Sequence, residues 1–116
     1  MVHETAISLF DKLCGGFKRE QLIRVVGPEG LGLYDSNEKR QTDTATSTNW
    51  AELYWGLRYK GFLPDGLSAE KADKLLKGTF GAKSSKTRIT DTRPDFSGKP
   101  KTGSYLARVI DLLDKF

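Results

Sequence analysis

Apolar side chains recur at helical spacing near the start of this chain. Four of them stand three and four positions apart, Ala6, Leu9, Phe10 and Leu13. This spacing is typical of one face of an amphipathic helix. Two glycines, Gly15 and Gly16, come directly afterwards, and glycine ends helices because it adopts a left-handed backbone without steric cost. We therefore predict a helix over residues 3–14.

The next apolar stretch has the composition of a strand. Gln21–Val26 is rich in β-branched residues, and a segment containing Gly27, Pro28 and Gly30 separates it from Leu31–Tyr34. Such a pattern is typical of two strands joined by a turn. We predict a β-hairpin over about residues 20–35, followed by a polar loop over residues 36–48.

Two helices joined by a tight turn are predicted next. For the first, residues 49–60, Asn49 and Glu52 have the spacing of a capping box, and Gly61 supplies a stop. For the second, residues 68–77, Ser68 is a typical N-cap and Gly78 a typical end. Its inward face carries Ala72, Leu75 and Leu76, and its outward face carries Lys71, Lys74 and Lys77.

The remaining chain combines an exposed segment with a final helix. Residues 81–102 contain only Ile89 and Phe96 as large apolar residues, so we expect an exposed loop with at most a short strand over Thr87–Thr90. Residues 104–116 regain a helical apolar stripe. The whole pattern predicts an α+β fold, a small and mainly helical single domain spanning residues 1–116. Within it we expect three subregions, 1–35, 36–48 and a basic helical part, 49–116.

Composition narrows the possible functions. The chain has 116 residues, 37% of them hydrophobic and 29% charged, which is ordinary for a globular domain. Its apolar runs are too short to cross a bilayer, and its charged start does not resemble a signal peptide. We therefore expect a cytoplasmic protein with no membrane partner.

The scarcity of reactive side chains argues against catalysis. Cys14 is the only cysteine and His3 the only histidine, so no disulfide, multi-histidine metal site or cysteine-rich zinc site can form within one chain. The acidic pairs, such as Asp111 with Asp114, have the spacing of solvated helix faces. We expect a non-enzymatic protein with no metal, no cofactor and no small-molecule substrate.

Basic residues are concentrated in one part of the chain. Between Lys60 and Arg108 there are eleven basic and five acidic residues, whereas the remainder holds eight basic and ten acidic ones. Basic side chains beside hydroxyl groups and exposed amides are typical of phosphate-binding surfaces. The candidate nucleic-acid-binding residues are Lys71, Lys74, Lys77, Lys83, Lys86, Arg88, Arg93, Lys99 and Lys101. The alternative is that these lysines only solvate the outside of a helix.

An aromatic pair offers a different hypothesis. Trp55 and Tyr59 stand four residues apart, on a side of the helix away from Leu53 and Leu57. They either pack inside the protein or anchor a protein interface. An exposed pair would favour a protein-interaction module, such as an inhibitor from a phage or mobile element.

The segment from Asn49 to Gly81 resembles a known family. Its order of Trp50, Glu52-Leu53, Tyr54, Leu57, Gly61, a short turn and a helix ending in Phe80-Gly81 is similar to the C-terminal region of RteC-type regulators from conjugative transposons of Bacteroidetes. The resemblance implies a helical region similar to a DNA-binding winged helix. Downstream, residues 83–102 depart from the family pattern. Together with the charge pattern, the resemblance favours a small nucleic-acid-associated regulator or accessory protein.

Overall fold

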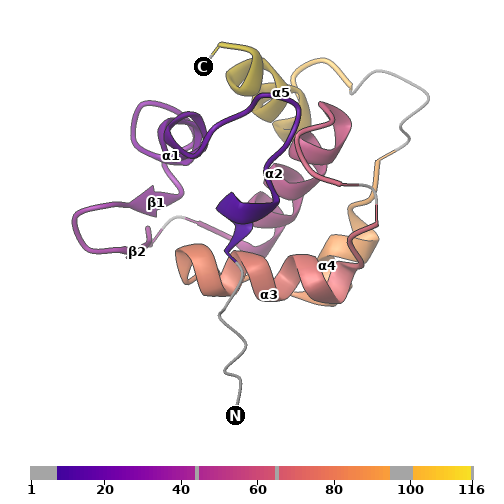
Figure 1. Ribbon diagram of the computed structural model, residues 1–116, viewed down its shortest axis with the longest axis horizontal. Coiled ribbons are helices and arrows are strands. Elements are labelled where there is room, and N and C mark those ends of the chain that lie inside the picture. Colours follow the sequence, from indigo (N-terminus) through magenta and orange to yellow (C-terminus); the bar gives the residue numbers. More distant parts are fainter. Residues whose placement is uncertain (1–7, 44, 65, 95–100, 116) are drawn as a thin grey trace.

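The computed structural model describes residues 8–43, 45–64, 66–94 and 101–115. The described part contains a short 3-10 helix, five α-helices and a two-stranded antiparallel hairpin, which lies at one edge of the molecule beside α1 (Figure 1). The elements are η1 (Leu9–Lys12), α1 (Arg19–Val26), β1 (Tyr34–Asp35), β2 (Arg40–Gln41), α2 (Ser47–Tyr59), α3 (Ala69–Phe80), α4 (Lys86–Asp91) and α5 (Tyr105–Lys115). This confirms the predicted small, mainly helical α+β fold.

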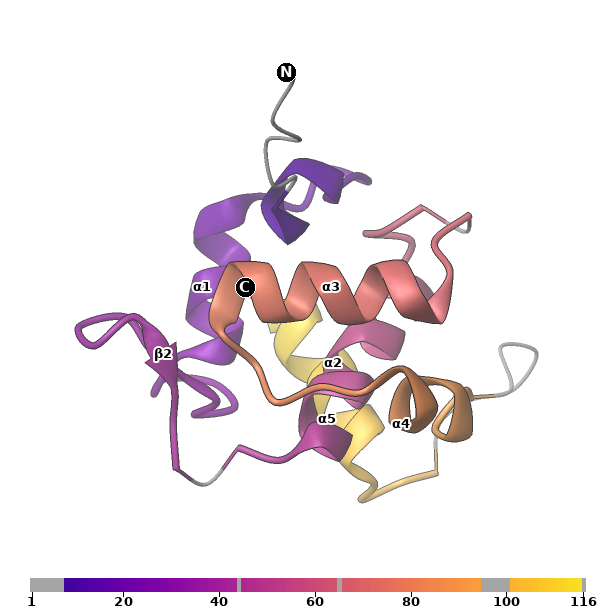
Figure 2. The same ribbon diagram turned by 90° about the horizontal axis from the view of Figure 1, so that it is seen from below.

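Helix α2 occupies the centre of the molecule. Leu53, Tyr54 and Leu57 are fully buried, and α5 and α4 both pack against this helix. Gly56 lets α5 approach closely, because a Cβ atom at this position would overlap the Val109 side chain. Figure 2 shows α3 crossing in front of α2 and α5. The predicted helices over residues 49–60 and 104–116 are confirmed within one or two residues.

The predicted strand over Gln21–Val26 is wrong, because these residues form most of α1. Leu22, Val25 and Val26 are buried, and their spacing of three and four residues places them on one helical face. The amide of Lys18 donates to Oε1 of Gln21 at 2.8 Å and satisfies a backbone group at the start of the helix. Burial of this face outweighs the strand preference of the β-branched residues.

A hairpin is present, but it lies after the first predicted strand and partly inside the predicted polar loop. Tyr34 pairs with Gln41 and Asp35 with Arg40. The Asp35 carboxylate accepts bonds from the amides of Asn37 and Glu38, as aspartate does in Asx turns. Lys39 has a positive φ of 56° and completes the turn. Polar side chains therefore build this hairpin through their own turn chemistry.

The structure places the start of α2 and the end of α3 at other residues than predicted. Thr46, not Asn49, is the N-cap of α2, and the two residues exchange hydrogen bonds in a capping box. Ser68 caps α3 as predicted. Gly78 does not end α3, which continues to Phe80 and stops at Gly81, where φ is 64°.

The N-terminal helix and the short strand also differ from expectation. Only the four residues of η1 represent the N-terminal helix in the described chain, and residues 3–7 of that prediction lie outside it. The strand predicted at Thr87–Thr90 is wrong, since α4 covers these residues. Ser85 caps α4 and Ile89 is buried beneath it, so burial of one apolar side chain fixes a short helix there. None of the described helices has the length and apolar character needed to cross a membrane.

Candidate nucleic-acid interface

Most of the predicted basic residues lie on α3, on α4 and on the linker between them, residues 81–85. The two helices pack against each other, and the linker runs from the end of α3 back toward α4 (Figure 2). We call their exposed basic side chains the α3–α4 surface, which consists of Lys71, Lys74, Lys77, Lys83, Lys86 and Arg88.

Helix α3 contributes three lysines that differ in their partners. Lys74 forms an ion pair with Glu70 at 3.7 Å, and Lys77 forms one with Asp73 at 3.0 Å. Exposed pairs of this kind contribute little to stability, but each carboxylate offsets the charge of its lysine. Lys71 has no ion pair among the described residues. The lysines on this face are therefore not equivalent.

The linker holds Lys83 outward from a fixed backbone. Ala82 and Ser84 are buried at 5% and 6% exposure, whereas Lys83 between them is exposed. This alternation follows from an extended backbone, in which successive side chains point to opposite sides. The Ser84 hydroxyl donates to the Asp73 carboxylate, so the linker is bonded to α3.

Gln41 ties the linker to the rest of the molecule. Its Oε1 atom accepts from the Lys83 amide at 2.7 Å and from the Trp50 indole nitrogen at 3.0 Å. One side-chain oxygen at the end of the hairpin thus joins the linker to the first turn of α2. Gln41 is a positioning residue for Lys83.

Helix α4 is fixed on its inner side and basic on its outer side. Ile89 is fully buried, and its carbonyl accepts a hydrogen bond of 2.7 Å from the indole nitrogen of Trp55. The exposed residues of this helix include Lys86 and Arg88. The position of these two cations is therefore set by a contact with the central helix α2.

Trp55 is buried, so the hypothesis of an exposed Trp55–Tyr59 pair is wrong for Trp55. The residue is 4% exposed, and Tyr59 is only partly exposed. The guanidinium carbons of Arg58 and Arg93 lie 5.5 Å and 5.7 Å from the Trp55 ring centroid, within the range of cation–π attraction. Arg93 thus packs on the protein. The aromatic residue positions α4 and leaves no free ring for a partner.

Four cations of the α3–α4 surface have no carboxylate partner in the described chain. They are Lys71, Lys83, Lys86 and Arg88. The seven basic residues between Ser68 and Pro94 face only three acidic ones, two of which are the partners of Lys74 and Lys77. The α3–α4 surface therefore carries a net positive charge, and four of its cations have no ion-pair partner in the described chain.

The α3–α4 surface as defined leaves out the last two candidates, Lys99 and Lys101. Lys99 lies outside the described residues. Lys101 is exposed in the segment before α5, and α5 packs mainly on α2 and α1.

The described residues contain no cluster of three or more histidine, cysteine or acidic side chains that could hold a metal. Cys14 is exposed, and its thiol donates to the Gly61 carbonyl at 3.4 Å. Elsewhere, burial raises the pKa of Glu52, and burial together with the Glu52 charge raises the pKa of Tyr105 to about 12. Glu52 lies on α2 and Tyr105 on α5.

Sequence reasoning missed the residues that hold the surface in place. Gln41 lies in a polar stretch that gives no sign of its two long-range bonds, and Asp73 and Ser84 carry no local pattern that pairs them. Trp55 stands out in the sequence as an aromatic residue, but its partner is a backbone carbonyl 34 positions away. Contacts of this kind depend on tertiary structure.

Comparison with known proteins gives no relative from which a role could be transferred. The chain matches no protein-family model, no curated protein and no solved structure.

Proposed function

We propose that this chain is a small non-catalytic nucleic-acid-associated protein that binds the phosphate backbone through the α3–α4 surface. The observation that carries the proposal is the set of four basic side chains without carboxylate partners in the described chain, Lys71, Lys83, Lys86 and Arg88. Cations of this kind bind phosphates and release condensed counterions, which is favourable at low salt. A regulatory role and a cytoplasmic location stay predictions, as does the resemblance to RteC-type regulators.

The packing of the surface supports this proposal over simple solvation of a helix. Three of the four cations lie in the linker and in α4, whose backbones are tied to Gln41 and Trp55. Fixed backbones reduce the entropy lost when the side chains engage a ligand. The protein-interaction alternative loses the exposed Trp55 ring on which it depended.

A binding titration tests the proposal. The protein is titrated against labelled random-sequence DNA, both duplex and single-stranded, at low and near-physiological salt. We expect binding that weakens steeply with salt and is lost in the quadruple variant K71Q/K83Q/K86Q/R88Q.

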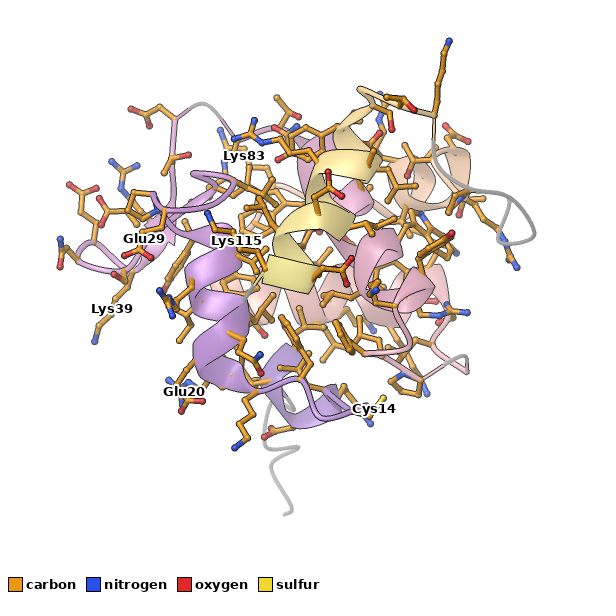
Figure 3. The ribbon with its side chains drawn as sticks, turned by 90° about the horizontal axis from the view of Figure 1, so that it is seen from above. Cys14, Glu20, Glu29, Lys39, Lys83 and Lys115 are labelled. Atoms are coloured by element: carbon orange, nitrogen blue, oxygen red, sulfur yellow. The ribbon has the colours of Figure 1, made fainter. Side chains whose placement is uncertain are left out.

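A charge-matched control distinguishes an effect of this surface on affinity from an effect of the protein's net charge. The variant K18Q/R24Q/K39Q/K115Q removes the same number of positive charges from the segment before α1, from α1, from the hairpin and from α5. Figure 3 shows Lys39 well separated from Lys83. We expect the control to retain most of the affinity. Equal loss in both variants, or no binding by the wild type at low salt, would refute the proposed function.

A further inference from the structure

In the described segment that carries the cations, between Gly66 and Pro94, no aromatic ring is exposed. Phe80 is the only aromatic residue between Gly66 and Pro94, and it is 1% exposed. Its ring stacks on Trp50 at a centroid distance of 5.2 Å, and the edges of Phe10 and Tyr34 close around it. The ring is part of the core and is closed to a ligand.

The indole that contacts α4 is closed to a ligand in the same way. Trp55 is 4% exposed, bonded to the Ile89 carbonyl and covered by Arg58 and Arg93. Proteins that bind single strands commonly stack bases on aromatic side chains, and each stacked base contributes about 1–3 kcal/mol. The described segment between Gly66 and Pro94 offers no exposed ring on which an unpaired base could stack.

The linker and α4, which carry three of the four cations, are fixed at three points. Gln41 bonds the Lys83 amide, Asp73 bonds the Ser84 hydroxyl, and Trp55 bonds the Ile89 carbonyl. Such a surface presents charge at set positions on two helices and the linker between them. It suits a ligand whose phosphates are also held at set positions.

Resting on the proposed function, we infer that the ligand of the α3–α4 surface is the backbone of a nucleic-acid duplex and not a single strand. A duplex carries one phosphate per about 1.7 Å of its axis, and its geometry is already ordered before binding. A single strand would lose conformational entropy when it becomes ordered on the surface. No exposed ring between Gly66 and Pro94 would offset that cost by stacking on a base.

The test compares ligands with equal numbers of phosphates. Wild-type protein is titrated with a DNA duplex, an RNA duplex and a single strand of DNA over a series of salt concentrations. We expect at least one duplex to bind about tenfold or more tightly than the single strand. The affinity for the duplex should fall with a log–log salt slope of up to about −3.6 if all four cations contact phosphates. The two duplex arms distinguish DNA from RNA as the source of the backbone.

The failures of the inference and of the proposed function are distinct. Equal or tighter binding of the single strand, still lost in K71Q/K83Q/K86Q/R88Q, would overturn the duplex inference and keep the proposed function. Binding to none of the three ligands, or binding unaffected by that variant, would overturn both. A conservative variant, K83R/K86R, retains both charges and should keep the duplex preference.

Discussion

The α2–α5 pair and the α3–α4 surface are held together by different forces. Between α2 and α5 the contact is apolar and close, with Gly56 directly beneath Val109. The linker and α4 bury few side chains, chiefly Ala82 and Ile89, and depend on polar bonds to Gln41, Asp73 and Trp55. Close packing therefore sets the core of this protein, whereas individual hydrogen bonds set the position of the cations on the linker and α4.

Gly56→Ala is expected to have the largest effect on stability, because it disrupts the close contact between α2 and α5. The added Cβ would overlap Val109, and overpacking of a core costs about 1–3 kcal/mol. We expect a loss of about 3 kcal/mol in the free energy of unfolding, measured by urea denaturation.

Gly78→Ala is the matched control for that change. It is also a glycine inside a helix, but it is exposed and nothing lies within 4 Å of an added Cβ. The substitution should stabilise the protein by about 0.5–1 kcal/mol through helix propensity. Similar effects at both glycines would show that α2 and α5 are not in close contact.

Trp55→Phe tests the hydrogen bond that joins α4 to α2. It removes the 2.7 Å indole bond to the Ile89 carbonyl, which then keeps only the 3.3 Å bond from the Thr92 hydroxyl, and a poorly satisfied buried group costs about 1–3 kcal/mol. Because α4 depends on this bond, hydrogen exchange should lose protection at Ile89 and Thr92 while Val109 and Leu113 keep theirs. Uniform loss throughout the helices would mean that α4 is not a separate unit.

Gln41→Ala tests the tie between the linker and α2. It removes the acceptor of the buried Trp50 indole and of the Lys83 amide, and we expect a loss of about 1–2 kcal/mol by urea denaturation. Gln41→Glu keeps an acceptor oxygen and should retain most of the stability. A full loss in Gln41→Glu would contradict the assigned role.

Glu52→Gln is expected to have the smallest effect on stability, and it changes the dependence on pH. Burial raises the pKa of Glu52, so the native state binds its proton more readily than the unfolded chain does. Stability from this group is therefore present at acidic pH and falls as the pH rises through the window between the ordinary and the raised pKa. Tyr105 and Arg108 on α5 are the other titratable groups coupled to this site.

The check is a set of urea denaturations at several pH values between about 4 and 8. The wild type should lose stability across the acidic part of that range, and Glu52→Gln should flatten this change while altering stability at neutral pH by only about a few tenths of a kcal/mol. An unchanged pH profile in Glu52→Gln would assign the dependence to other groups.

Local sequence determined the long helices and much of the chemistry of this protein. The periodic apolar residues of α2 and α5 and the cap at Ser68 are local signals, because helix spacing and capping act within a few residues. The concentration of basic residues in the part of the chain that forms α3 and α4 is likewise visible in the sequence itself. A single cysteine and a single histidine exclude many kinds of catalytic site through composition alone.

Tertiary structure alone decided the rest. Gln21–Val26 has strand-forming residues, but burial of one face makes it a helix, and Ile89 does the same for α4. No local pattern reveals that Gln41 reaches Lys83 or that Trp55 bonds the Ile89 carbonyl, since these pairs are 42 and 34 positions apart. Local propensities are weak compared with burial and long-range hydrogen bonds, so these elements take their form and place only when the whole chain packs.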